Sequence, residues 1–240
     1  MKYTFLLLGD NRSGTTSIWS FMRYHKQIAV GIVKERLHRL PIDTPNLSFY
    51  IKDNFSTTSK TKILLDGSPN IISFRPTFID MIKDIPEINR LCCLYTVRPP
   101  IERLYSYSHL MMVNYRKGRE GKPYFIKEKR IDHDSLRYFL LKDCTSYWKM
   151  RLIEKKIGKS NLLPIQLDKL SDNIHNIFNF LDIDDDPIPF GKINRSIDHA
   201  PNIEQLKLRS SIENWVCENS ELVDKVNRLD SERIKGRYGI

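Results

Sequence analysis

Hydrophobic residues along this chain come in short runs, separated by longer segments with an amphipathic pattern. Short apolar runs bounded by turn residues indicate buried strands, whereas apolar residues spaced by three or four indicate helices. Strands are expected at residues 5–8, 28–33, 63–66, 91–97 and 161–167. Helices are expected at residues 16–24, 49–55, 76–85, 101–113, 134–157, 170–181 and 203–229. This alternation predicts an α/β fold of three layers, in which a central parallel sheet is flanked by helices.

The first strand leads into a loop rich in glycine and hydroxyl residues, Gly9-Asp10-Asn11-Arg12-Ser13-Gly14-Thr15-Thr16-Ser17. A glycine-flanked turn that opens a helix exposes backbone N–H groups and favours anion binding. The glycine spacing is that of a phosphate-binding loop, but Thr15 stands where nucleoside triphosphatases require lysine. Arg12 supplies a cation from within the loop, so we expect an anion other than ATP. The glycine pair alone fits an ordinary strand–turn–helix about as well.

Four polar segments each follow a predicted strand: residues 12–17, 34–35, 66–70 and 98–106. In a parallel α/β sheet, ligands bind beyond the carboxyl ends of the strands. The four segments are therefore expected to converge on one crevice. Within the last of them, an Arg98 guanidinium and a Ser106 hydroxyl could share one phosphate, because arginine binds phosphate through two parallel hydrogen bonds. For this pair alone, a surface arginine and an ordinary helical serine remain an open alternative.

Composition indicates the kind of partner and the cellular location to expect for this protein. Lys and Arg total 39 against 29 Asp and Glu, a net charge of +10, which favours anionic partners of unspecified kind. The four cysteines have no metal-binding spacing and are expected to be reduced. No signal peptide is recognised, and no apolar stretch approaches the ~20 residues of a membrane span. We expect a soluble, cytoplasmic protein with a single domain over residues 1–240.

Two strings resemble motifs of one enzyme family. Arg12-Ser13-Gly14-Thr15-Thr16-Ser17, after an N-terminal strand, resembles the 5′-phosphosulfate loop of sulfotransferases that use 3′-phosphoadenosine-5′-phosphosulfate (PAPS). Cytosolic members usually have lysine in place of Arg12, whereas tyrosylprotein sulfotransferases and many bacterial members have arginine. Arg98-x-Pro100-x-x-Arg103-x-x-Ser106 is similar to the family's 3′-phosphate motif and follows the loop in the family's order. Together with the matches below, the resemblance covers most of the chain.

The resemblance implies a role for each matching residue. The phosphosulfate would lie on the backbone N–H groups of Ser13, Gly14, Thr15, Thr16 and Ser17, with the Arg12 side chain beside the transferring group. Arg98 and Ser106 would bind the 3′-phosphate.

A third match, Lys34-Glu35, implies the catalytic base. Glu35 stands where heparan-type, tyrosylprotein and many bacterial sulfotransferases have a glutamate that accepts the proton of the acceptor hydroxyl. Read alone, such a pair is usually a solvated surface pair. A short late match, Asn194-Arg195-Ser196, resembles a loop whose serine contacts the donor, although an ordinary turn remains open. The resemblance implies no metal.

Two departures from the family pattern concern the residues around the base. The segment 36–39 reads Arg-Leu-His-Arg instead of the Pro-His-Phe-Phe that often follows Lys-Glu, which bears on the acceptor pocket. The turn Asp66-Gly67-Ser68-Pro69-Asn70 is similar to the family's Lys-(Ser/Thr)-Pro turn. Gly67, however, stands where several relatives have a lysine that helps neutralise the bridging oxygen.

The expected activity is transfer of a sulfuryl group from PAPS to a hydroxyl group, releasing adenosine 3′,5′-bisphosphate (PAP). Carbohydrate hydroxyls are the preferred acceptors because of the glutamate base and the basic, aromatic-containing segment 115–130, most of which we expect to be an exposed excursion. A peptide tyrosine or a small alcohol or phenol remains open.

Two other classes of function fit less of the sequence. A kinase or ATPase would need the loop lysine that Thr15 replaces. A nucleic-acid-binding protein would need a basic stripe with stacking aromatic residues. No motif indicates the oligomeric state.

Overall fold

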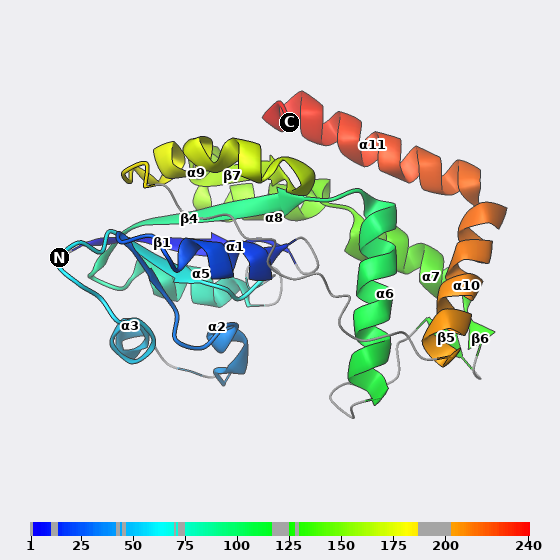
Figure 1. Cartoon of the computed structure of the whole chain (residues 1–240), viewed down its shortest axis with the longest axis horizontal. Helices are drawn as coiled ribbons and strands as arrows, with labels where there is room; N and C mark the ends of the chain where they lie inside the picture. Colours follow the sequence, from blue (N-terminus) through cyan, green and yellow to red (C-terminus); the bar gives the residue numbers. More distant parts are fainter. Residues whose placement is uncertain are drawn as a thin grey trace. The chain divides into compact units, whose positions relative to one another are not determined.

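A computed structural model of the chain is shown in Figure 1. The structure describes residues 2–10, 14–41, 44, 47–69, 71, 75–116, 125–127, 130–186 and 203–240. The chain forms two compact units. The first unit comprises Met1–Val97 and Lys149–Arg195, and the second comprises Arg98–Trp148 and Ser196–Ile240.

The first unit contains a five-stranded parallel sheet with the strand order β2-β3-β1-β4-β7. Figure 1 shows β1, β4 and β7 of this sheet running side by side. The strands are β1 (Tyr3–Leu8), β2 (Ile28–Val30), β3 (Ile63–Asp66), β4 (Ile88–Val97) and β7 (Leu162–Gln166). All five predicted strands are present, and the predicted parallel α/β fold is confirmed.

Helices pack on both faces of the sheet, and its strands are therefore buried on both sides. Leu6 and Leu8 of β1 share one core cluster with residues of α1 (Thr15–Met22) and α9 (Ile174–Leu181). Phe5 belongs to the opposite face, since successive strand residues alternate. Its ring packs against Tyr50 of α3 (Ser48–Asn54), and α5 (Pro76–Lys83) contacts β4. The three-layer arrangement follows.

The second unit contains a separate core built mostly from helices. Its elements are α6 (Pro100–Arg116), β5 (Ile126–Lys127), β6 (Arg130–Ile131), α7 (His133–Phe139), a π-helical turn η1 (Leu140–Cys144), α10 (Ile203–Glu218) and α11 (Ser220–Tyr238). Phe125 is completely buried in this core, so the expected exposed excursion is wrong at this residue. No helix within the described part of the chain is long and apolar enough to cross a membrane.

The long helix predicted at residues 134–157 is interrupted. After η1, Thr145 adopts an extended conformation and a new helix, α8 (Tyr147–Ile157), begins. Its first backbone N–H groups are bound by the buried carboxylate of Asp230 on α11, at 3.0 Å from Ser146 N and 2.9 Å from Tyr147 N. A carboxylate at a helix N-terminus satisfies donors that have no partner within the helix. The predicted C-terminal helix is likewise divided, at Asn219.

Replacing Asp230 with alanine is expected to lower the free energy of unfolding by about 1–3 kcal/mol, because buried N–H groups lose their acceptor. Urea unfolding measures this change. Asp224→Ala is the control, since Asp224 lies exposed on the same helix; that change should stay within about 0.5 kcal/mol. Equal effects of the two substitutions would contradict the capping role.

Candidate functional site

The loop after β1 ends in a glycine that starts α1. Gly14 has a left-handed conformation, with φ of 83°, and its carbonyl accepts a hydrogen bond of 3.1 Å from Ile18 N. A Cβ atom there would lie 2.3 Å from Leu167 Cδ1, so the position favours glycine for two reasons. The first turn of α1 contains no acidic residue, which leaves its helix dipole suited to an anion. Arg12 and Ser13 lie outside the described residues.

The start of this loop is held by a buried carboxylate. Asp10 accepts hydrogen bonds of 2.8 Å from Tyr95 Oη on β4 and 2.9 Å from Lys149 Nζ on α8. Gly9 lies against the Tyr95 ring, where a Cβ atom would approach Cδ2 to 2.5 Å. Sequence reasoning did not identify Lys149 or Tyr95, because both partners are distant in the chain and neither belongs to a motif.

The Lys34-Glu35 pair follows β2, as predicted. Lys34 Nζ lies 2.9 Å from Glu35 Oε1, and the Glu35 side chain is 43% exposed. Glu35 has a positive φ of 64° and precedes a short helix, α2 (Arg36–Arg39), that the sequence did not predict. Such a backbone conformation is unfavourable for a residue with a side chain and persists only where the surroundings enforce it.

The turn after β3 supplies the enforcing contacts at the start of α2. Asp66 is buried and accepts hydrogen bonds from Tyr50 Oη and, at 2.7 Å, from Ser68 N. The Ser68 hydroxyl in turn accepts a 3.2 Å hydrogen bond from Leu37 N in the first turn of α2. Ser68 thus caps the helix, and the Glu35 carboxylate makes no capping hydrogen bond.

The other end of α2 is held by an arginine. Arg75 donates hydrogen bonds to the carbonyl oxygens of Leu37, His38 and Leu40, at 3.2 Å for Leu37 and 2.9 Å for His38. A helix of four residues is not stable by itself, because nucleation fixes many dihedral angles for few hydrogen bonds. The position of Glu35 therefore depends on tertiary contacts at both ends of α2.

Gly67 permits a close approach of side chains from two other segments. A Cβ atom at this residue would lie 2.8 Å from Trp19 Cδ1 on α1 and 2.9 Å from Lys34 Cγ. These contacts, together with the Ser68–Leu37 hydrogen bond, bring α1, the Lys34-Glu35 pair and the 66–69 turn together. Of the four segments expected to converge, 34–35 and the 66–69 turn are thus in contact, whereas segment 12–17 lies partly outside the described residues and its convergence stays a prediction.

The predicted 3′-phosphate motif belongs to the second unit. Arg98 directly follows β4, and its Nε lies 2.9 Å from Glu102 Oε2. Ser106 is half-buried within α6. Arg103 of the same motif is buried and donates hydrogen bonds of 3.0 Å to Ser146 Oγ and 3.1 Å to the Asp143 carbonyl. Arg103 therefore fixes α6 to the segment that precedes α8.

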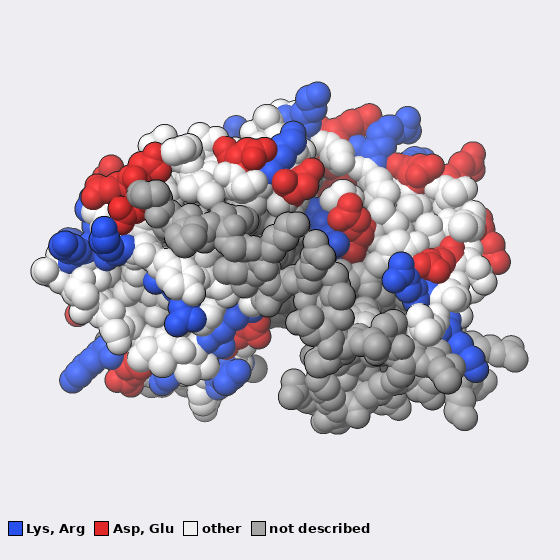
Figure 2. All heavy atoms as spheres, in the orientation of Figure 1, with Lys and Arg blue, Asp and Glu red and all other residues white. Residues whose placement is uncertain are grey.

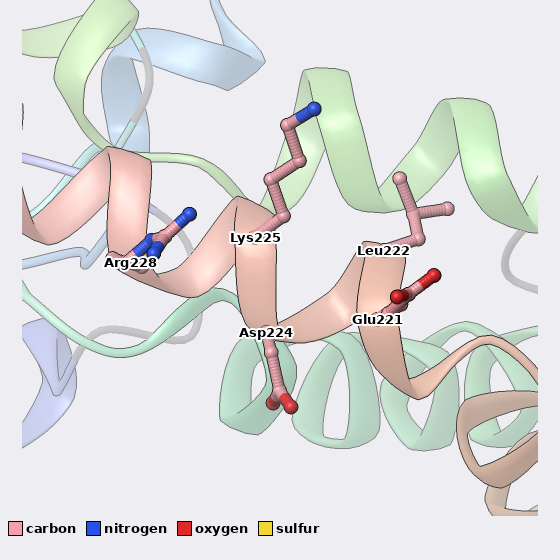
Figure 3. A pocket seen from close by; sticks show the side chains of 5 residues that line it. All are labelled: Glu221, Leu222, Asp224, Lys225 and Arg228. Carbon is pink, nitrogen blue, oxygen red and sulfur yellow. The ribbon is translucent and has the colours of Figure 1, made fainter.

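One remaining candidate residue and one pocket complete the description of the site. Ser196 lies outside the described residues. The described residues that line a pocket in the second unit all belong to α11 (Figure 3), and none of them is a candidate site residue. Its lining residues are Glu221, Leu222, Asp224, Lys225 and Arg228. No group of three metal-ligating side chains occurs among the residues that the structure describes.

Comparison with known proteins identifies the fold. A sulfotransferase from Alicyclobacillus acidocaldarius matches with a TM-score of 0.56 at 15% identity, over 93% of this chain and 96% of the other. The chain has a sulfotransferase fold.

Two further sulfotransferase structures match this fold more weakly. The sulfotransferase domain of a Synechococcus PCC 7002 olefin synthase matches with a TM-score of 0.45 at 13% identity, over 89% of this chain and 96% of the other. A mouse sulfotransferase complexed with PAP matches with a TM-score of 0.39 at 11% identity, over 95% of this chain and 89% of the other. No family model matches the sequence, and no curated protein does.

The free energy of unfolding should depend on pH through the titration of Asp66. Burial raises the pKa of this carboxyl above its ordinary value of 3.8, so the folded state binds the proton more tightly than the unfolded chain. The corresponding stabilisation is complete below the ordinary value and is lost as the pH rises through the raised value.

Asp66→Asn does not titrate at this position and isolates the effect. The unfolding free energy of the wild type minus that of the variant is expected to fall as the pH rises from about 4 toward neutral. Urea titrations at a series of pH values measure the difference. A difference that stays constant or grows with pH would be inconsistent with a raised pKa.

Proposed function

We propose that this chain transfers a sulfuryl group from PAPS to an acceptor hydroxyl, releasing PAP. The observation that carries the proposal is the glycine-led N-terminus of α1, which follows β1 in a sulfotransferase fold. Trp19, further along α1, and Lys34 both lie against Gly67. An anion on the first turn of α1 would be stabilised by backbone N–H groups and the helix dipole. The sequence resemblance assigns this anion as the donor phosphosulfate.

Donor binding would use both motifs. The backbone of Ser13, Gly14, Thr15, Thr16 and Ser17 would hold the phosphosulfate, and Arg12 would lie beside the transferring group. Arg98 and Ser106 would bind the 3′-phosphate. The Arg98 guanidinium would give up its ion pair with Glu102 and pair with the phosphate instead. Ser196 would add a donor contact. These assignments rest on the motif matches, to which the structure adds the local conformation of the described residues.

Glu35 would act as the general base. As its carboxylate accepts the hydroxyl proton, the acceptor oxygen bonds to sulfur and the bond from sulfur to the bridging oxygen breaks. The electron pair of that bond stays on the 5′-phosphate of PAP. The reaction thus needs positioning and charge stabilisation, which a preorganised site can supply. We propose a carbohydrate hydroxyl as acceptor, supported by the glutamate base and the basic residues of segment 115–130.

The rival functions have less support. A kinase would need a loop lysine and a magnesium ion, whereas Thr15 occupies the lysine position and our proposal calls for no metal. A nucleic-acid-binding protein would present a continuous basic stripe. Figure 2 shows basic and acidic side chains interspersed over the described residues on the face in view.

PAP is expected to bind far more tightly than AMP, because charge-assisted hydrogen bonds to the 3′-phosphate contribute roughly 1.5–3 kcal/mol each. Calorimetry on the wild type and on Arg98→Ala measures the contribution, and the variant should lose most of the preference. Arg137→Ala is a matched control, since Arg137 is exposed on α7. Equal affinity for PAP and AMP in the wild type would remove the 3′-phosphate assignment.

Glu35→Gln should lower kcat by about 10²–10⁴-fold, the usual contribution of a general base, with little change in PAP affinity or thermal stability. Rates with labelled PAPS against glycans, tyrosine peptides and small hydroxyl compounds measure the loss and identify the acceptor. An acidic phenol should show a smaller defect than a sugar hydroxyl, because its proton is lost more easily. Asp53→Asn, on the exposed end of α3, serves as the control. Near-normal turnover of Glu35→Gln would contradict the role of Glu35 as base and indicate that it is an ordinary solvated surface residue.

A further inference from the structure

Lys34 differs from a surface lysine in how its side chain is enclosed. Its side chain is only 23% exposed, compared with 71% for Lys26, another ion-paired lysine of the first unit. The stem passes over Gly67, where the space of a missing Cβ atom lies 2.9 Å from Lys34 Cγ. Any side chain at residue 67 would have to displace this stem. The absence of a side chain at Gly67 thus leaves the space through which the Lys34 stem passes.

Trp19 forms the other wall of this space. Its Cδ1 atom lies 2.8 Å from the same Cβ position of Gly67. The neighbouring Nε1 atom is buried and has no acceptor among the described residues. A buried donor without a partner is unfavourable and points to a group that binds there. The Lys34 ammonium and the Trp19 N–H both donate, and each of these two side chains adjoins Gly67; donors of this kind suit an anionic oxygen.

Because Lys34 is paired with Glu35, the compensation of its ammonium charge depends on the reaction. While Glu35 is ionised, the two charges compensate at 2.9 Å. When Glu35 accepts the acceptor's proton, its side chain becomes neutral and the Lys34 charge loses its counter-ion. At that moment negative charge develops on the bridging oxygen of the donor. An uncompensated cation nearby would stabilise this charge in the transition state more than in the ground state.

We propose that Lys34 is the cation of the transfer step, held over Gly67 against Trp19 and released from Glu35 by proton transfer. The inference rests on the proposed function and deepens it. One set of contacts connects three adjacent segments: α1 supplies Trp19, the segment after β2 supplies Lys34, and the turn after β3 supplies Gly67. The loss of a side chain at residue 67 and the enclosure of Lys34 are then two aspects of one site.

The test compares Lys34→Met with Lys34→Arg in steady-state sulfuryl transfer. Methionine keeps the apolar stem and removes the charge, so kcat should fall about 10²-fold, while KM for PAPS changes less than about threefold. Arginine restores a cation and should recover at least about a tenth of wild-type kcat. Lys26→Met makes the same chemical change in an exposed ion pair and should leave both constants unchanged.

Gly67→Ala provides a second, independent variant. The added methyl group displaces the Lys34 stem, so kcat should fall at least about tenfold in the wild-type background. The same substitution should cost little more in the Lys34→Met background, because the ammonium is already absent there; such non-additivity marks residues that act together. Thermal unfolding of every variant separates this effect from a loss of folded protein. If Lys34→Met fails to fold, Lys34→Gln replaces it in the same comparison.

Each outcome decides the proposal. A raised KM with unchanged kcat, no rescue by arginine, or additive losses for Lys34→Met and Gly67→Ala would each overturn the role of Lys34. These results leave wild-type transfer and PAP binding intact, so the proposed function would survive them. A wild-type protein that neither binds PAP nor transfers sulfuryl groups would instead overturn the proposed function, and the role of Lys34 with it.

Discussion

The hydrogen bonds that the buried Asp66 carboxylate accepts from Tyr50 and Ser68 organise the candidate site. They fix the turn after β3, and this turn places the Ser68 hydroxyl under the first turn of α2. Because Ser68 caps the helix from another segment, the Glu35 carboxylate is not needed as a cap, and Glu35 has a left-handed backbone conformation. A buried carboxyl group with raised pKa is unfavourable in isolation and is tolerated here because its oxygens are bonded.

Buried carboxylates also lie at the starts of the loop after β1 and of α8. Asp10 joins the beginning of the loop after β1 to Tyr95 and Lys149, and Asp230 accepts hydrogen bonds from the N–H groups at the start of α8. In each case a side chain from a distant part of the chain satisfies backbone groups or fixes a loop that local sequence leaves undetermined. Function then depends on polar contacts that the hydrophobic pattern does not reveal.

The two arginines of the 98–106 motif lie in different surroundings. Arg103 is buried and donates hydrogen bonds to Ser146 Oγ and the Asp143 carbonyl, which fix α6 to the segment before α8. Arg98 lies nearer to solvent and pairs with Glu102, an arrangement from which a phosphate can displace the carboxylate. A motif written as one string therefore contains residues with different physical tasks.

The sequence by itself determined the five strands, the parallel α/β class and the glycine that begins α1. These features follow from short-range patterns: apolar runs that must be buried, and a left-handed position that favours glycine. Tertiary structure alone decided that the predicted helix at 134–157 ends early, since its restart at Tyr147 needs Asp230 from 83 residues away. It also decided the short helix α2, capped by a serine 31 residues away, and the enclosure of Lys34 over Gly67. Hydrogen bonds between distant residues leave no periodic signal in a sequence, whereas burial of apolar side chains does.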